Sequence, residues 1–597
     1  MRQQHFNLEK LFHRFYFKKH ILITLLILLL LPGLTWAANH YVRSGANGNN
    51  SGSDWTNAYT SLPSTLIRGD TYYIADGNYG PYTFNDAHSG STYIYIKKAT
   101  TSDHGTETGW SAGYGDGVAE FATSSAYNTL TFSKGYYELD GQVGGGPGSW
   151  KTGHGFKISN SSSTASYNYV RCVFFNSVDA DYVTIKHADI ELRGRLLDKA
   201  DDNIYDNTGA SNVTISYCYV HNGSRVHVLT GYGDDWTFEY NYFYKNSSNA
   251  AVHGESFAPR DNDGFIVRYN MFVDCYGSGV IYLKDNDPTW TFDRWEVYGN
   301  IFYHTPAFSE GACAAGVFGM GGRGNTAVTN LKFYNNSISG INYVDSPEPT
   351  NSGVQILGDD SYGNEVYNNV WYNSAINTSS GFVNVTRDYN FFYDTHQYNS
   401  SGTDNAEVLA GGEDHSQLGT ADPFTDWENG DFSLTLTTNA ANNGANLGAP
   451  YNTDMNGNTR GADGYWDMGA LEAGDDTTPS TITDTTASEF SCTENPRNVT
   501  MTWTTNEICN CRIDTSDKGD YDDATADSVS NTDSTSHSDT ESFACDDTYN
   551  RYVYCEDPFG NESTLTTITF DVLAEPPPPV EGFTATMCGE GGSASSN

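Results

Sequence analysis

Short stretches of alternating apolar and polar residues recur along most of the chain, with turn-forming residues between them. Residues 267–269 and 297–299 are two examples, and such alternation predicts strands with one buried face. In six of these stretches an Asn stands two residues before a large apolar residue, at Asn241, Asn270, Asn300, Asn336, Asn369 and Asn390. Counted from Ala188 and Cys218, which hold the same position upstream, the intervals are 30, 23, 29, 30, 36, 33 and 21 residues. An irregular period in this range predicts repeated strand units joined by loops of variable length.

The repeat predicts a coil of strands in which each turn lies on the previous one, roughly 4.8 Å away. In such a coil the Asn column falls at the same corner of every turn. A buried side-chain amide without a partner costs free energy, so we expect each Asn to form hydrogen bonds with the turns above and below it.

The first 37 residues have the pattern of an export signal. Five basic residues precede the apolar run at residues 21–31, and residues 35–37 include the small residues that a signal peptidase needs. A run of 11 residues is too short to span a bilayer comfortably, and no other apolar stretch approaches that length. We therefore expect a secreted or cell-surface protein that has no membrane span after signal removal. An uncleaved anchor is the alternative.

Composition divides the rest of the chain into a long stacked region and a smaller unit. The stacked region is rich in Tyr, Asn, Gly and Thr and has almost no helical periodicity. Near the C-terminus, alternating strands at residues 499–504, 551–555 and 566–572 predict a β-sandwich similar to fibronectin type III modules. The predicted organisation is a signal peptide at 1–37, a stacked domain at 38–475, a polar linker at 476–482, the sandwich at 483–575 and a Pro-rich, polar tail at 576–597.

Charge limits the partners of the protein. Without the signal the chain holds 26 basic and 73 acidic residues, a formal charge of −47. A surface this acidic repels nucleic acid and anionic membranes, so neither is an expected partner. It also repels acidic polysaccharides, unless salt screens the charge or a local basic cleft overrides it.

The ten cysteines fall into two groups. In the stacked region, Cys172, Cys218, Cys275 and Cys313 are expected to behave as small buried apolar residues. The other six crowd the last fifth of an exported chain, which predicts disulfides: Cys492, Cys509, Cys511, Cys545, Cys555 and Cys588.

Both ends of the stacked region resemble a known superfamily. Residues 66–79 and the strand at 92–97 are similar to the first coils of right-handed parallel β-helix proteins of the pectate-lyase-like superfamily. Residues 454–460 and 467–472 resemble the terminal coil of many exported β-helix proteins. The resemblance implies an all-β fold, a right-handed parallel β-helix solenoid, over roughly three quarters of the chain. Function has to be argued from the site, because this fold supports many activities.

Polar residues that point outward on successive turns can converge although they lie far apart in the sequence. The second strand of each turn aligns through its apolar core at residues 226–229, 251–253, 280–283, 317–320 and 354–357. The polar residues gather on the first three of these turns: Arg225, His227, His253, Glu255, Arg260, Lys284, Asp285 and Asp287. Three adjacent turns span roughly 10 Å, so this block is the predicted site.

The spacing in this block resembles the active site of the chondroitinase B and alginate lyase family. There a Glu-x-Glu pair precedes a catalytic Lys by five residues, and an Arg follows on the next turn. Here Arg260 stands five residues after Glu255, and Lys284 stands five residues after a Gly on the next turn. The two basic residues are exchanged, His253 replaces the first carboxylate, and Asp285 stands where the family often has His. The resemblance implies a polysaccharide lyase for an acidic, uronate-containing polysaccharide, with Ca²⁺ as its cofactor and Glu255 as the one recognisable ligand.

Elimination across a uronate needs a group that neutralises the carboxylate, a base for the C5 proton and an acid for the departing oxygen. Arg260 offers a planar fork for the carboxylate, and Lys284 is the expected base if desolvation beside a cation favours its neutral form. His253 or His227 would protonate the leaving group, and Glu255 would orient Arg260 or bind the metal. The expected substrate-binding residues are His227, Arg225, Tyr282 and Asp285.

The same residues also fit simpler interpretations. Lys284 and Asp285 can form a solvated strand corner, and Glu255 with Arg260 can be a surface ion pair. His253 can be a structural histidine whose hydrogen bonds are satisfied.

Two other functions compete with a lyase. A polysaccharide hydrolase is one alternative, since Asp234 and Asp235 with His253 superficially resemble polygalacturonase-like enzymes. Asp234 and Asp235 stand before a predicted strand, whereas those enzymes carry the Asp pair on the strand. We therefore rank hydrolysis below elimination. The other alternative is a non-catalytic glycan-binding or adhesion protein, which the appended sandwich favours. In each case we expect a monomer.

Overall fold

In a computed structural model of the protein, the described residues are 37–124, 127–162, 169–192, 201–246, 254–275, 277, 279–308, 316–320, 326–341, 352–358, 360–397, 404–435, 437–473, 480–486, 490–492, 496–519, 534–556 and 562–573. Almost all of the predicted signal and the predicted tail lie outside them. The chain divides into two compact units, Met1–Glu472 and Ala473–Asn597.

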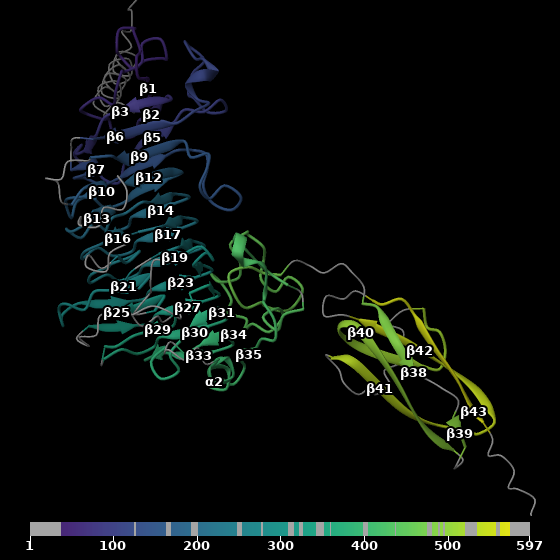
Figure 1. Cartoon of the computed structure of the whole chain (residues 1–597). Helices are drawn as coiled ribbons and strands as arrows, with labels where there is room; N and C mark the ends of the chain where they lie inside the picture. Colours follow the sequence, from purple (N-terminus) through teal and green to yellow (C-terminus); the bar gives the residue numbers. More distant parts are fainter. Residues whose placement is uncertain are drawn as a thin grey trace, which may run out of the picture. The chain divides into compact units, whose positions relative to one another are not determined.

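The first unit is a parallel β-helix, in which successive turns contribute strands to three parallel sheets (Figure 1). Among the described residues sheet A has 12 strands: β1 (Asn39–Val42), β2 (Thr71–Ile74), β5 (Ile94–Lys98), β8 (Tyr137–Asp140), β11 (Val183–Lys186), β14 (Thr214–Ser216), β17 (Thr237–Glu239), β19 (Ile266–Arg268), β23 (Glu296–Tyr298), β27 (Lys332–Tyr334), β30 (Glu365–Tyr367) and β33 (Thr386–Asp388). Sheet B likewise has 12: β3 (Gly77–Tyr79), β6 (Ala119–Thr123), β9 (Phe156–Asn160), β12 (Ala188–Leu192), β15 (Tyr219–His221), β18 (Tyr242–Tyr244), β20 (Met271–Val273), β24 (Ile301–Tyr303), β28 (Ser337–Ser339), β31 (Val370–Ala375), β34 (Phe391–His396) and β35 (Gln417–Leu418).

Sheet C is divided into two parts. The first part contains β4 (Tyr82–Phe84), β7 (Asn128–Phe132), β10 (Arg171–Phe175), β13 (Asp202–Asp206) and β16 (Val226–Leu229). The second contains β21 (Ile281–Leu283), β25 (Phe318–Met320), β29 (Val354–Gln355) and β32 (Phe382–Val383). Every strand pair described in the three sheets is parallel, as β17 with β19, β18 with β20 and β21 with β25 illustrate, so the predicted parallel β-helix is confirmed.

Short elements complete the first unit. They are η1 (Ala112–Tyr114), the parallel pair β22 (Thr291–Asp293) and β26 (Ala327–Thr329), α2 (Ala406–Ala410), η3 (Trp427–Asn429) and the hairpin of β36 (Phe424–Asp426) and β37 (Asp431–Leu434). The apolar face of α2, Ala406 and Leu409, joins the main core next to β34, so this helix covers apolar residues of the last turns.

The predicted Asn column lies at the corner between sheets A and B. Asn270 is representative, since its backbone N–H and its Nδ2 both donate to Oδ1 of Asn300, at 2.9 and 3.0 Å. All six column residues are 0% exposed. The column begins where the Cys218 N–H donates to Asn241 and ends where the Asn390 N–H donates to a carboxylate oxygen of Glu413. This ladder satisfies amides that would otherwise be costly to bury.

The residue before each ladder position makes the corner. It adopts a positive φ, for example 54° at Tyr217, 56° at Tyr240 and 57° at Tyr269. A left-handed backbone is uncommon for a bulky residue and here is repeated turn after turn. These tyrosines stack on one another, with ring centroids 4.9 Å apart for Tyr217 and Tyr240, which explains part of the high Tyr content.

Aromatic side chains also stack inside the coil. Phe243, Phe272 and Phe302 occupy equivalent positions on successive turns, with centroid distances of 4.9 and 4.8 Å. Cys172 and Cys218 are fully buried, as predicted for small apolar residues, and burial raises the pKa of the Cys218 thiol to about 12. Cys313 lies outside the described residues.

The second unit is built mainly from antiparallel strands: β38 (Ile482–Thr486), β39 (Phe490–Ser491), β40 (Arg497–Asp514), β41 (Ser534–Phe543), β42 (Asp547–Glu556) and β43 (Thr566–Leu573). The first half of β40 pairs with β41 and its second half with β42. Two disulfides, Cys492–Cys545 and Cys511–Cys555, lie in its core. The second unit thus contains antiparallel sheets, while the fibronectin type III-like sandwich stays a prediction.

Across the described residues, no helix has the length and apolar character needed to cross a membrane.

Candidate functional site

The predicted site lies where the two parts of sheet C meet. Among the described residues, the turn between β16 and β21 has no sheet C strand but isolated bridges, and its Phe257 bridges Val228 on one side and Ile281 on the other. The predicted alignment placed residues 251–253 at this level, and the pairing of Phe257 corrects it to residues 256–258. Alternation alone did not locate the strand, because both segments carry an apolar residue in their centre.

Backbone hydrogen bonds bring Arg260 and Lys284 to the same level on adjacent turns. The Phe257 carbonyl accepts from the Tyr282 N–H at 2.9 Å, and the Pro259 carbonyl accepts from the Lys284 N–H at 3.0 Å. In a parallel pair with this register, the next residue, Arg260, lies beside Lys284. On its other side Arg260 bridges Gly231.

Lys284 is paired with a buried carboxylate. Its Nζ lies 2.7 Å from Oε1 of Glu255, and the side chains are 15% and 1% exposed. The ammonium also lies 4.6 Å from the ring centroid of Tyr282, within the range of a cation–π contact. Tyr282 is half-buried, so Lys284 is held between a carboxylate and an aromatic ring at the edge of the solvent.

Arg260 is a more open cation. Its backbone N–H donates to Asn262 at 2.9 Å, and one guanidinium nitrogen donates to Oδ1 of Asn207 at 3.3 Å. No carboxylate of the described residues lies within ion-pair distance of this guanidinium. Its charge is therefore available to an anionic ligand.

Arg225 belongs to the same charged region one turn earlier. It forms two hydrogen bonds to the fully buried Asp202, at 2.8 and 2.5 Å. Burial alone would lower the pKa of Arg225, but the charge of Asp202, its hydrogen bond and, more weakly, the charge of Glu255 raise it. Arg225, Glu255, Arg260 and Lys284 thus lie on three consecutive turns.

His227 lies inside the coil, and the expectation that it contacts substrate is corrected. The side chain is 0% exposed, and its ring nitrogens lie 2.8 Å from the Ser256 hydroxyl and 3.2 Å from the Tyr244 carbonyl oxygen. The register places it in an inward column with Cys172 and Asn203, whose side chains likewise bond to carbonyls of the sheet B strand that follows in the chain. It is a structural histidine of a second corner.

Two other residues predicted for the site are Asp285, which is buried, and His253. Asp285 is only 3% exposed, so its carboxylate is directed away from the outer surface that carries Lys284. His253 lies outside the described residues.

The carboxylates considered for hydrolysis serve the backbone at another corner. Asp234 accepts from the N–H of Asp263 at 3.0 Å, and Asp263 accepts from the N–H of Asp293 at 2.7 Å. Asp234 precedes β17 and Asp263 precedes β19, and both strands belong to sheet A. These carboxylates therefore do not lie on strands of sheet C, where the candidate site is. Asp235 has a positive φ of 57° at the same turn.

The described residues of the site do not fit a calcium ion. Calcium takes six to eight oxygen ligands, and of the described site residues Glu255 offers a carboxylate whose Oε1 already binds the ammonium of Lys284. Elsewhere in the described chain, three side chains of types that can ligate a metal, Asp189, Glu191 and His221, lie together on sheet B, where Lys157 lies 2.6 Å from Glu191. We derive no step through a metal at the sheet C site.

Two site residues were not predicted from the sequence. Asp202, which holds Arg225, and Asn207, which contacts Arg260, belong to β13 and the residues after it. Extending the strand alignment one turn toward the N-terminus would have included them, because Asp202 is aligned with Val226 in the sheet.

Fold and site together define a parallel β-helix protein with a cluster of basic and acidic side chains on one outer sheet. No protein-family model matches the chain, and no curated protein matches it significantly. A search of solved structures found an alginate lyase from Paenibacillus sp. str. FPU-7, at 12% identity and a TM-score of 0.32, over 59% of this chain and 95% of that one. It also found the Dettilon tailspike protein, at 13% identity and a TM-score of 0.30, over 84% and 87%.

A third similar structure is a PL6 family polysaccharide lyase from Pseudopedobacter saltans, at 12% identity and a TM-score of 0.28, over 62% of this chain and 92% of that one. At these identities and scores the comparisons carry no argument about activity. Function rests on the side chains described above.

Proposed function

We propose that the protein is a polysaccharide lyase that cleaves an acidic, uronate-containing polysaccharide by β-elimination. The observation that supports it is the pairing of Arg260 and Lys284 on adjacent turns, with the carboxylate of Glu255 at 2.7 Å from the amine. In a chain with a net charge of −43, two partly exposed cations at one level of the coil form a local basic site for a carboxylate.

Each residue has one role in the proposed reaction. The Arg260 guanidinium binds the uronate carboxylate and spreads the charge that develops on it. Lys284 Nζ, after passing its proton to Glu255, takes the proton from C5. The electron pair of that C–H bond forms the C4=C5 double bond, and the C4–O bond breaks. The departing oxygen takes a proton, and His253 stays the residue predicted from the sequence to supply it.

A direct assay tests this proposal. The purified full chain is incubated with alginate, pectate, chondroitin and dermatan, with and without a chelator, and ultraviolet absorbance reports unsaturated uronate ends. We expect a signal on at least one polymer, and a loss of about a hundredfold or more in Arg260→Ala and Lys284→Ala. Lys134→Ala, which removes a partly exposed lysine paired with Asp179, is the matched control and keeps full turnover. New reducing ends without absorbance would replace elimination by hydrolysis.

Glycan binding without turnover is the second candidate function. The observation that favours it is the same ion pair, because the Lys284 amine already contacts the Glu255 carboxylate at 2.7 Å and would have to leave it to approach a C5 proton. This function would be supported if a polymer binds to the protein and neither unsaturated ends nor new reducing ends are released.

We also infer that the protein acts outside the cytoplasm as a monomer. The two disulfides support an oxidising compartment. N-terminal sequencing of the exported protein tests removal of residues 1–37, and light scattering tests the monomer.

A further inference from the structure

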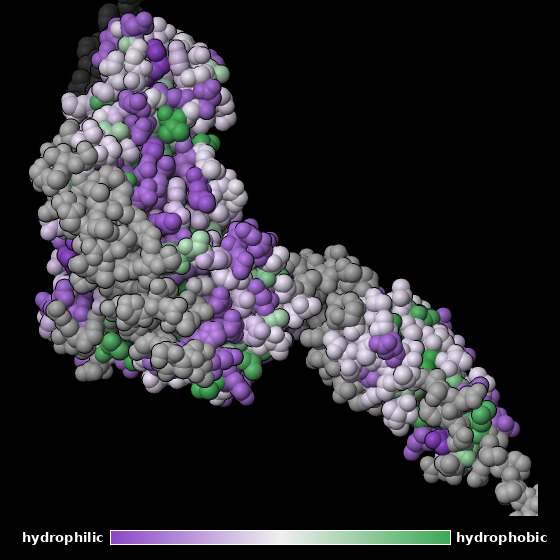
Figure 2. Space-filling view, viewed as in Figure 1, coloured by the Kyte–Doolittle hydropathy of each residue, from purple (hydrophilic) through white to green (hydrophobic). Residues whose placement is uncertain are grey.

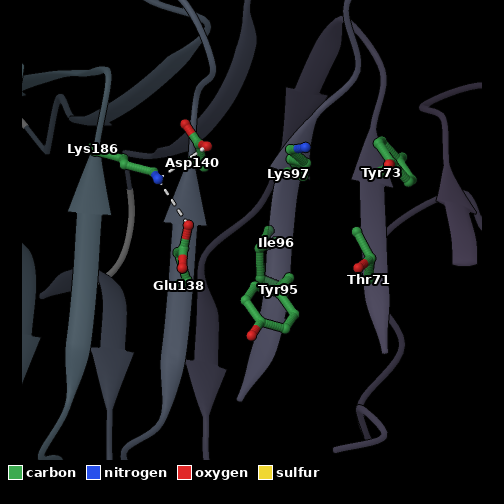
Figure 3. Close-up of a pocket in the computed structure, with 8 residues that line it drawn as sticks. All are labelled: Thr71, Tyr73, Tyr95, Ile96, Lys97, Glu138, Asp140 and Lys186. Atoms are coloured by element: carbon green, nitrogen blue, oxygen red, sulfur yellow. Dashed lines mark ion pairs between the residues drawn. The ribbon is translucent and has the colours of Figure 1, made fainter. Parts of the chain in front are cut away.

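A hollow of about 410 Å³ lies on sheet A, and thus on a different sheet from the candidate site. Strands β2, β5, β8 and β11 line it side by side (Figure 3). Its polar and aromatic lining is Tyr73, Tyr95, Lys97, Glu138, Asp140 and Lys186. At the level of β9 to β14 the first unit is strongly hydrophilic in the space-filling view (Figure 2).

The lining side chains form two rows along the stack. Strand pairing aligns Lys97 with Asp140 and Asp140 with Lys186, and it aligns Tyr95 with Glu138. Paired residues of a parallel sheet project to the same side, so each row repeats a hydrogen-bonding group roughly every 4.8 Å. That spacing is close to the length of one pyranose unit in an extended polysaccharide.

Ion pairs hold the polar groups of the hollow in place. Lys186 Nζ lies 2.8 Å from Oε1 of Glu138 and 3.3 Å from Oδ2 of Asp140, and these side chains are 29%, 29% and 16% exposed. Burial alone would lower the pKa of Lys186, but hydrogen bonds and charges from Glu138 and Asp140 outweigh it and raise the pKa. Lys97 pairs with Asp103 from the loop after β5. Groups fixed before binding lose little entropy when a ligand arrives.

A cluster of tyrosines borders the hollow. Tyr95 is 39% exposed and stacks on Tyr93, with ring centroids 6.1 Å apart. Tyr93 makes an edge contact with Tyr136, which stacks on Tyr182 at 4.8 Å. Tyr182 is also 39% exposed, so aromatic faces from three successive turns reach the solvent beside fixed charged groups.

The chemistry of the hollow selects among ligands. A phosphate or another compact anion would have to place its whole charge against Glu138 and Asp140 in the middle of the lining, whereas a sugar, even one that carries a carboxylate, can turn its hydroxyls toward them. A purely apolar ligand would leave the charged rows without water or hydrogen bonds. A sugar matches both features, because its hydroxyls donate to carboxylates and accept from an ammonium while its C–H face packs on an aromatic ring.

We infer that this hollow is a binding subsite for an extended oligosaccharide, with one ring on Tyr95 and hydroxyls bonded to Glu138, Asp140 and Lys186. The inference rests on the proposed action on a polysaccharide and adds a second contact to it, on sheet A and not on sheet C. The subsite holds a stretch of polymer and takes no part in the bond that breaks.

The test measures binding directly, in a full-length protein that carries Arg260→Ala so that the sheet C site is weakened. Calorimetric titrations use hexasaccharides from alginate, pectate, chondroitin and xylan. We expect at least one to bind, and we expect Tyr95→Ala, and separately Asp140→Asn, to lower its affinity about tenfold. Tyr362→Ala is the matched control, since Tyr362 is 66% exposed elsewhere on the coil, and it leaves the affinity unchanged.

Two results would overturn the subsite: none of the four hexasaccharides binds, or Tyr95→Ala and Asp140→Asn bind as tightly as Tyr362→Ala. Thermal melting of each variant verifies that the fold is kept. The absorbance assay on the unmodified protein separates the two proposals, because a lyase without the subsite still releases unsaturated ends. A binder without turnover loses affinity in Tyr95→Ala and releases none.

Discussion

At the scale of single residues, the candidate site is organised around a buried charge. Glu255 is 1% exposed, and such a carboxylate is stable only when it is compensated. Lys284 supplies an ammonium from the next turn, so the pair joins two turns where the described part of sheet C has isolated bridges in place of a strand. The contact between Lys284 and Glu255 thus stabilises the fold and also belongs to the proposed reaction. Measuring the stability of variants separates the first role from the second.

We predict that Lys284→Met lowers the free energy of unfolding by about 3 kcal/mol, because it removes the cation that lies 2.7 Å from the buried Glu255 carboxylate. The double variant Lys284→Met/Glu255→Gln recovers most of this loss, since it removes the charge as well. Urea unfolding of the full chain measures both. Equal losses in the single and double variants would show that the ion pair does not stabilise the turn.

At the scale of elements, the Asn ladder connects the turns into one unit and ends at a carboxylate. Asn390 donates from its backbone N–H and from Nδ2 to Oε2 of Glu413, each at 3.1 Å. Arg387 lies 2.8 Å from the other oxygen. Burial, partly offset by Arg387, raises the pKa of Glu413 from its usual 4.5 to about 7.

Glu413 therefore makes stability depend on pH. Between pH 4.5 and pH 7 the folded chain holds a proton that the unfolded chain has released, so the free energy of unfolding falls as pH rises through this window. The fall amounts to at most about 3 kcal/mol. We predict that Glu413→Gln flattens the pH dependence of the melting temperature over this range, while Glu407→Gln, on the exposed side of α2, leaves it as in the unmodified protein. Parallel curves for all three proteins would contradict the assignment.

At the scale of the whole molecule, the two units are stabilised differently. The first buries one continuous core along the stack and shows no disulfide among its described residues. The second has a core of about a dozen residues with two disulfides that close segments of 53 and 44 residues. A small core needs covalent links, whereas a long solenoid gains stability from every neighbouring turn.

Reduction should therefore act on one unit only. In a loop-closure model, each disulfide contributes about 4 kcal/mol to the second unit. We predict that calorimetry with a reductant shifts the transition of the second unit to lower temperature and leaves that of the first unit in place. Cys492→Ser/Cys545→Ser without reductant should reproduce about half of the effect. A joint shift of all transitions would mean that the units unfold together.

Much of the fold could be predicted because it repeats within each turn. The Asn column at Asn270 and Asn300 and the alternation beside it are local patterns, and stacking follows from the need to satisfy buried amides. The site was harder, because loops of different length separate its parts. Residues 251–253 and 256–258 both fit the strand pattern, and only pairing with Val228 and Ile281 decides between them. Strict alternation predicts that His227 points outward, because its neighbour Val228 points into the core. In the structure both residues are buried at that corner, so alternation fails there.

The sequence by itself determined the stacked strand coil, its Asn corner and the block of turns that carries Arg260, Glu255 and Lys284, since each depends on spacing within one turn or between neighbours. Only the tertiary structure decided which of these side chains face solvent, which carboxylate binds which cation, and where sheet A is hollowed. Those properties arise from the register between turns, and register depends on packing across the whole coil.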